Sequence, residues 1–241
     1  MKFYETHFHE YLNIQENKSL HNIKNVNFTS LENLIIYGPS GIGKYTKTLS
    51  IIKKHSSSNL RYEKKLALIY NNNTYYFKIS DIHYEVDMSL LGCNAKLLWH
   101  EIYNQIVDII SSKNDKQGII LCKNFHNIHN ELLEIFFSYM QLHYNRLINI
   151  RFYIITENIT FIPNNILNCC YHIKLSRPSK NKYNKVLNIN LLPSHSIKNI
   201  TNIKALKNNN ITISSKKKTI NILENHKILC DNILDKIINY Q

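Results

Sequence analysis

The sequence of 241 residues is poor in the residues that build turns and cross-links: it contains five glycines, four prolines and five cysteines. The cysteines are odd in number and none is spaced C-x-x-C, which argues against both a disulfide framework and a zinc site. No apolar run approaches the roughly 18 residues of a membrane-spanning helix. The first residues, MKFYETHFHEY, are aromatic and acidic where a signal peptide would be apolar. We therefore expect a nuclear or cytosolic protein, neither secreted nor bound to a membrane.

Acidic residues are also scarce, and the chain is strongly basic. It carries 30 Lys and Arg against 17 Asp and Glu, a net charge of +13. A basic balance favours an anionic partner such as nucleic acid. The abundance of Asn, Ile, Lys and Tyr is also what an AT-rich genome encodes, so the charge alone leaves nucleic-acid contact open. With 44% apolar residues, the chain can form a packed core.

Three of the five glycines, Gly38, Gly41 and Gly43, lie within six residues of one another. The segment LIIYGPSGIGKYTKT starts with a short apolar run, typical of a buried parallel strand, and the residues from 46 to 54 predict a helix. Strand, glycine-rich turn and helix are the context of a phosphate-binding loop. Its backbone N–H groups and the helix N-terminus attract phosphate, and Lys44 supplies an ammonium group.

This loop predicts binding of ATP or ADP, although a plain glycine turn is the alternative. The pattern G-x-x-x-x-G-K-[ST] requires a hydroxyl after the lysine to hold Mg²⁺, and here that place is taken by Tyr45. Mg²⁺ is therefore doubtful, with Thr46 the one possible metal ligand. The predicted nucleotide-binding residues are Gly38, Pro39, Ser40, Gly41, Ile42, Gly43, Lys44, Tyr45 and Thr46.

The rest of the chain alternates between strand and helix patterns. Strands are predicted at 34–37, 82–86, 119–122, 151–155 and 171–175, helices at 94–110 and 128–144, and a hairpin within 59–80 that turns at 71–73. This alternation predicts an α/β fold with a parallel sheet covered on both faces. Two parts are expected: a nucleotide-binding domain at 1–178, and a basic, diverged lid-like or tail segment at 179–241. Residues 181–241 contain ten lysines and three acidic residues, with a helix predicted at 219–240.

Four motifs in order resemble the small subunits of replication factor C, the eukaryotic clamp loader. They are IIYGPSGIGKYTK; IHYEVDMSLLGC, which matches at His83-Tyr84, Glu85-Val86, Ser89 and Gly92; the Walker B-like stretch at 118–140; and IITENITFIPNNILNCC. The resemblance covers about residues 5 to 178. It implies an AAA+ domain with strand order 5-1-4-3-2, in a chain that lacks the family's collar pattern and is degenerate and shortened.

Several positions depart from the family. Asn124 and His126 stand where the Walker B carboxylates would hold magnesium, and Asn168 stands where the family has its arginine finger. A histidine at such a place is also compatible with simple packing. Asn158 matches the polar residue of the first sensor, although a turn asparagine would look the same. The resemblance thus implies nucleotide binding with weak or no hydrolysis.

The function expected from the resemblance is that of a clamp-loader small subunit in DNA replication, which helps to load a sliding clamp. Its partners would be other replication factor C-like subunits, the clamp and the backbone of double-stranded DNA. Two alternatives stay open: an active DNA-dependent AAA+ ATPase such as a helicase loader, and a relic P-loop fold that serves as a protein-interaction module.

Overall fold

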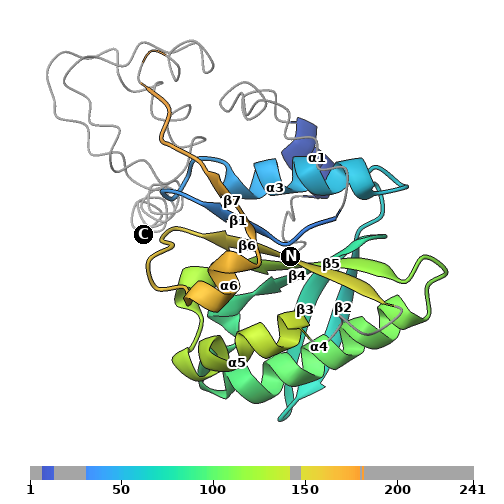
Figure 1. Ribbon diagram of the computed structural model, residues 1–241. Coiled ribbons are helices and arrows are strands. Elements are labelled where there is room, and N and C mark those ends of the chain that lie inside the picture. The colour runs from blue at the N-terminus through green and yellow to red at the C-terminus, as the bar shows by residue number, and fades with distance from the viewer. Residues whose placement is uncertain (1–6, 14–30, 142–147, 180, 182–241) are drawn as a thin grey trace, which may run out of the picture.

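The fold is built on one mixed β-sheet. The computed structural model describes residues 7–13, 31–141, 148–179 and 181 (Figure 1). Within them, seven strands form a sheet in the order β2-β3-β4-β5-β6-β1-β7. The strands are β1 (Leu34–Tyr37), β2 (Lys64–Tyr70), β3 (Asn73–Ile79), β4 (His83–Asp87), β5 (Gln117–Lys123), β6 (Asn149–Thr156) and β7 (Tyr171–Lys174). The predicted α/β class is therefore confirmed, with a sheet that is mostly parallel.

The predicted five-strand order 5-1-4-3-2 does not match this sheet. The β2–β3 hairpin joins the sheet beside β4 and is antiparallel to its neighbours, so the sheet has seven strands and is mixed. The five strands that pair in parallel run β7-β1-β6-β5-β4, which is 5-1-4-3-2 when they are numbered in chain order, so the mismatch comes from the added hairpin. A strand order carried over from a resemblance could not include an insertion that joins the sheet itself.

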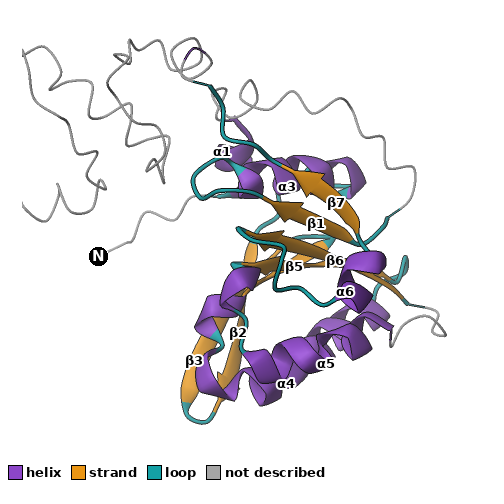
Figure 2. Cartoon of the chain, turned by 60° about the vertical axis from the view of Figure 1, so that its left-hand side comes forward, coloured by secondary structure: helices purple, strands orange, loops and turns teal. Residues whose placement is uncertain are grey.

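Helices cover both faces of the sheet (Figures 1 and 2). The helices α1 (Phe8–Asn13) and α3 (Lys44–Ile52) lie on one face, whereas α4 (Ala95–Ser111) and α5 (Asn130–Gln141) lie on the other. The short helix α6 (Asn164–Asn168) packs Ile166 into the same cluster as α4 and α5. The 3-10 turns are η1 (Lys53–His55), η2 (Met88–Leu90), η3 (Gly92–Asn94) and η4 (Phe125–Asn127).

The central strands form because their residues are apolar on both sides. Along β1, Ile35 faces the α4–α5 side, and Leu34 and Ile36 face the α1–α3 side. Such continuous apolar runs are typical of parallel strands buried between two helical layers. Trp99 of α4 is fully buried and packs on Phe136 of α5, with ring centroids 5.3 Å apart. The core therefore consists of two apolar layers with the sheet between them.

The hairpin turns where the sequence predicts, because Asn71 and Asn72 both have positive φ angles, 48° and 60°. Asparagine tolerates this conformation better than most residues, and two such residues in succession fit a tight hairpin turn. The hairpin meets the rest of the sheet at a single residue pair, Ile79 with Tyr84. The edge of β4 beyond Tyr84 is therefore not paired with β3.

One predicted helix starts at a different residue, and two predicted segments lie partly outside the described residues. Helix α3 starts at Lys44, two residues earlier than predicted, because Gly43 directly before it has left-handed geometry and ends the loop there. The end of the helix predicted at 128–144 and nearly all of the segment 179–241 lie outside the described residues. In the part of the chain that the structure describes, no helix has the length and apolar character that spanning a bilayer requires.

Candidate nucleotide-binding site

The glycine-rich loop lies at the carboxyl edge of the sheet, directly after β1 and between the ends of β6 and β7. Its glycines have φ angles of 149° at Gly38, 69° at Gly41 and 84° at Gly43, which residues with side chains rarely adopt. Ile42 is fully buried and anchors the loop in the core of the α3 side. Strand, loop and helix thus have the arrangement that binds phosphate in P-loop proteins.

Lys44 is the first residue of α3, and its side chain folds back over the loop. Its Nζ donates to the carbonyl oxygens of Gly38 at 2.6 Å and Pro39 at 2.7 Å. Burial lowers the pKa of Lys44; the charge of Glu157 opposes this change, and the charge of Arg177 adds to it. Two cationic side chains, from α3 and from the segment after β7, therefore act at the same loop. This is a suitable electrostatic setting for a polyphosphate.

Tyr45 does not direct its hydroxyl toward a metal ligand position. Its Oη donates to Oε1 of Glu85 on β4 at 2.6 Å. Burial raises the pKa of Tyr45, and the nearby Glu85 carboxylate raises it further. The side chain is consequently a neutral phenol that is committed to a carboxylate of the sheet.

Glu85 is 4% exposed and is the centre of a buried polar cluster. Burial by itself would raise its pKa, but His83, Lys123 and Tyr45 outweigh that effect and hold the pKa of Glu85 below its usual value. Nζ of Lys123 lies 3.5 Å from Oε2, and Nε2 of His83 lies 3.4 Å from Oε1. The carboxylate is therefore stabilised in its ionised form.

His83 is fully buried, and its environment indicates which ring nitrogen carries the proton. Its Nδ1 lies 2.5 Å from Oγ of Ser80, and this Oγ already accepts the backbone N–H groups of Ile82 and His83. The Ser80 hydroxyl can then donate only to Nδ1, which leaves Nε2–H to donate to Glu85. We assign the Nε2–H tautomer on this basis.

The N-terminal helix covers this cluster. The Phe8 ring lies 4.8 Å from the His83 ring, and the Tyr11 ring meets Tyr45 edge-on at 5.0 Å. The backbone N–H of Phe8 also donates to Glu63 at 2.8 Å. Helix α1 therefore packs against His83 and Tyr45, two of the side chains that contact Glu85.

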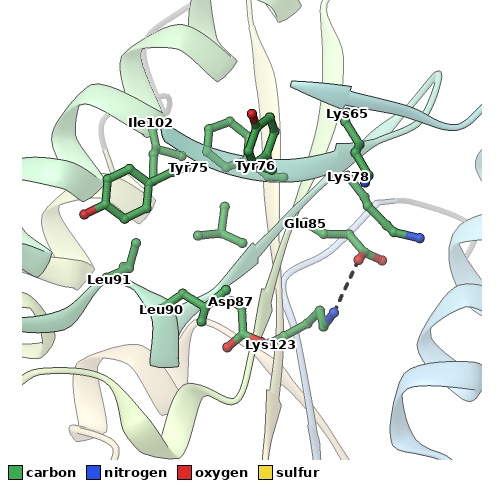
Figure 3. A pocket seen from close by; sticks show the side chains of 12 residues that line it. Lys65, Tyr75, Tyr76, Lys78, Glu85, Asp87, Leu90, Leu91, Ile102 and Lys123 are labelled. Carbon is green, nitrogen blue, oxygen red and sulfur yellow. Dashed lines mark ion pairs between the residues drawn. The ribbon is translucent and has the colours of Figure 1, made fainter. Parts of the chain in front are cut away.

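Lys123, the last residue of β5, connects the loop to an adjacent cavity. Its Nζ lies 4.9 Å from the centre of the Tyr45 ring, and its side chain is 32% exposed. Figure 3 shows Lys123 and Glu85 pointing toward one another at the wall of a cavity of about 280 Å³. The cavity opens where β3 separates from β4, and Tyr75 and Tyr76 also line it. Lys123 is thus accessible from the carboxyl edge of the sheet.

The predicted Walker B positions lie close to this site but make other contacts. Nδ2 of Asn124 donates to both carboxylate oxygens of Asp87 at 3.0 Å, at the neighbouring strand end. His126 lies in η4, and its Nδ1 is buried without a hydrogen-bond partner. Neither side chain contributes a carboxylate.

The other two predicted positions lie at opposite edges of the sheet. Asn158 follows β6 at the carboxyl edge, and its carbonyl oxygen accepts a hydrogen bond of 2.7 Å from the hydroxyl of Thr156, the buried last residue of that strand. Asn168 ends α6, before β7 begins beside Leu34. It therefore lies at the amino edge and cannot reach the loop of its own chain.

Sequence reasoning did not assign four charged residues to this site: Glu85, which it named only as a motif match, Lys123, Glu157 and Arg177. Their shared signal is position, because each lies near the carboxyl end of a predicted strand, where ligands bind in open α/β sheets. Thr46, the possible metal ligand, is half-buried in the first turn of α3. Among the described residues, no three His, Cys, Asp or Glu side chains come together as a metal site would require.

Comparisons with known proteins give only distant similarity. No family model and no curated protein match the chain. Among solved structures, a RuvB variant from Thermotoga maritima matches with a TM-score of 0.41 and 11% identity, over 65% of this chain and 42% of RuvB. Rif2 from Saccharomyces cerevisiae matches with a TM-score of 0.41 and 13% identity, over 80% of this chain and 74% of Rif2. The match to RuvB thus spans less than half of that protein.

The arrangement of the chain itself defines its class. A mostly parallel sheet, a glycine-rich loop after a central strand, and a helix that begins at Lys44 are the features of a P-loop-like α/β domain. The chain's own geometry supports this class, and the distant similarities identify no family within it.

Proposed function

We propose that this chain is a nucleotide-binding subunit that binds ATP or ADP at Gly38–Thr46 and hydrolyses it weakly or not at all. The observation that carries this proposal is the loop itself, with three positive-φ glycines between a buried strand and the start of α3. Backbone N–H groups in such a loop converge on an anion, and the dipole of α3 adds to the attraction.

Weak hydrolysis follows from the side chains around the loop. Phosphoryl transfer in P-loop proteins needs a carboxylate at the end of the third parallel strand to hold Mg²⁺. Here that strand, β5, ends at Lys123 and is followed by Asn124, which is bonded to Asp87. Asn168 stands where the resemblance places the family's arginine finger, and the loss of such a finger removes about 10³-fold or more of rate.

We further propose a role in a clamp-loader-like assembly in DNA replication, in which this chain binds nucleotide as a structural element. The resemblance of four sequence motifs to replication factor C small subunits supports this role. The partners would be related subunits, a sliding clamp and the backbone of double-stranded DNA. Co-purification from the native source with larger replication factor C subunits and a clamp is the expected result, and its absence would contradict the assembly role.

Nucleotide affinity tests the core of the proposal. Lys44→Ala removes a charge-assisted phosphate contact and should weaken binding of ADP by about 2 kcal/mol or more, measured by isothermal titration calorimetry. Lys96→Ala is the matched control, because it removes the same charge from an exposed position of α4 on the opposite face. Equal titration curves for Lys44→Ala and the unmodified chain would contradict nucleotide binding at the loop.

Single-turnover hydrolysis tests the second part. We expect a rate below about 1% of that of a competent ATPase of this type. A rate near about 1 per second would instead favour an active AAA+ ATPase such as a helicase loader.

A further inference from the structure

The two positions that hold Mg²⁺ in P-loop proteins contain residues that contact each other in this chain. P-loop NTPases hold the metal between the hydroxyl residue after the loop lysine and a carboxylate at the end of the third parallel strand. The residue after the loop lysine is Tyr45, and the last residue of the third parallel strand, β5, is Lys123, one position before the Asn124 that the sequence resemblance indicated. Nζ of Lys123 lies over the Tyr45 ring, 4.9 Å from its centre. The Tyr45 ring and the Lys123 ammonium group therefore lie where other P-loop proteins have a hydroxyl and a carboxylate.

These residues do not fit Mg²⁺, which requires near-octahedral coordination by hard oxygen ligands. The Tyr45 hydroxyl is neutral and donates to Glu85. Oε1 of Glu85 already accepts hydrogen bonds from Tyr45 and His83, and Oε2 is paired with the ammonium group of Lys123. A divalent cation that approached this carboxylate would also meet the positive charge of Lys123.

The same ammonium can provide charge for a polyphosphate. Lys123 is 32% exposed at the carboxyl edge, and its pairing with Glu85 at 3.5 Å is longer than a close hydrogen bond. The hydrogen bonds of Glu85 with Tyr45 and His83 do not involve Lys123, so they do not depend on where the Lys123 side chain points. Lysine binds phosphate as a point charge, as the loop lysine of P-loops does.

We propose that the phosphate loop binds metal-free nucleotide polyphosphate, with the ammonium group of Lys123 in the place that P-loop proteins give to Mg²⁺. This inference rests on the proposed nucleotide binding. The positive charge that balances the phosphates then comes from the chain itself, through Lys44 and Lys123. Mg²⁺ bound to the nucleotide brings a second cation against Lys123, so it does not strengthen binding.

The decisive experiment needs no variant. The full-length chain is titrated with fluorescently labelled ADP and with ATP, once in excess EDTA and once in excess Mg²⁺. The expected result is an affinity in EDTA equal to or tighter than that in Mg²⁺. An affinity about tenfold or more tighter in Mg²⁺ would overturn this inference while leaving nucleotide binding intact. Absence of binding in both buffers would instead contradict the proposed function.

Two variants then test Lys123 itself. In EDTA, Lys123→Met should weaken nucleotide binding by about tenfold or more, whereas Lys123→Arg, which keeps the charge, should stay close to the unmodified chain. Thermal unfolding of each variant shows whether the fold is retained. Unchanged affinity of a folded Lys123→Met chain in EDTA would overturn the role of Lys123. If that variant does not fold, the comparison of EDTA with Mg²⁺ in the unmodified chain still decides the inference.

Discussion

Gly38, the first glycine of the loop, has no room for a side chain. A Cβ placed on it would lie 2.1 Å from the backbone carbonyl oxygen of Leu175, and its φ of 149° is strained for other residues. Because Leu175 N–H also bonds to Tyr37 at 2.8 Å, this oxygen cannot move without disturbing the end of β7. We predict that Gly38→Ala lowers the free energy of unfolding by about 2 kcal/mol or more, measured by denaturant titration.

Gly92 is the matched control for this substitution. It also has a positive φ, 61°, but a Cβ there would meet nothing within 4 Å. Gly92→Ala should therefore cost only the backbone strain, about 1 kcal/mol. Equal losses in the two variants would show that the approach of Leu175 to Gly38 is unimportant.

Glu85 links stability to pH. Its pKa in the folded chain is below the ordinary value of 4.5, so the folded state favours the ionised form. This contribution is fully present above about pH 4.5 and is lost as the pH falls through the folded pKa. We predict that Glu85→Gln is less stable near neutral pH, and that its free energy of unfolding falls less steeply in acid, by up to about 1.4 kcal/mol per pH unit.

Urea titrations at a series of pH values from neutral into acid would measure this effect. Asp81, whose pKa is also lowered because hydrogen bonds from Ser56, Ser57 and Ser58 outweigh its burial, is present in both proteins and gives a common background. Parallel stability curves for the two proteins would contradict the role assigned to Glu85.

The β2–β3 hairpin is the element that is least firmly joined to the sheet. It pairs with β4 only through Ile79 and Tyr84, whereas β5 is paired along its length with β4 and β6. We predict that the amides of β3 that bond to β2 exchange with solvent at least about tenfold faster than those of Ile119 to Cys122, measured by native-state hydrogen exchange. Equal protection would mean that hairpin and central sheet open together.

The elements themselves were largely predictable, since each depends on local sequence. The apolar runs around Ile35, Ile120 and Ile154 predicted the central strands, and the asparagines at 71–73 predicted the hairpin turn. The pairing of that hairpin with β4 was not predictable in the same way. It depends on a contact between strand edges that no local pattern encodes.

The site was predictable in its loop but not in its charged surroundings. Glycine spacing identified Gly38–Thr46, because the residues that shape the loop are adjacent in sequence. Tyr45, Glu85 and Lys123 come from three elements and meet only once the strands are side by side. In addition, successive residues of a strand point to opposite faces of the sheet, so an error of one residue at a strand end exchanges one side chain for another. The sequence indicated Asn124 at the end of β5, whereas Lys123 is the side chain that approaches Tyr45 and Asn124 bonds to Asp87.

At the scale of the whole molecule, the net charge of +13 bears on DNA. We predict that the full chain binds double-stranded DNA weakly and without sequence preference, with an affinity that falls steeply with salt, because contacts to phosphates release counterions. Fluorescence anisotropy with two unrelated duplexes over a range of salt concentrations would measure this. Sequence-selective or salt-insensitive binding would contradict it.

The lysine-rich segment 181–241 can be tested in the same assay. If it binds the duplex, its removal should lower the slope of log affinity against log salt by about 0.9 for each phosphate that its lysines neutralise. An unchanged slope would assign phosphate binding to residues 1–180.

Trp99 gives the molecule a built-in optical reporter. It is the only tryptophan of the chain, and it is fully buried on the α4–α5 side of the sheet among Tyr103, Phe136 and Tyr139. The phosphate loop lies at the carboxyl edge of the sheet and packs Ile42 on the α1–α3 side, opposite the side that contains Trp99. The fluorescence of Trp99 therefore reports the loss of packing between α4 and α5 as the chain unfolds. We expect a ligand bound at the loop to leave its emission wavelength unchanged. Tryptophan fluorescence can thus measure stability during a nucleotide titration without being changed by the binding itself.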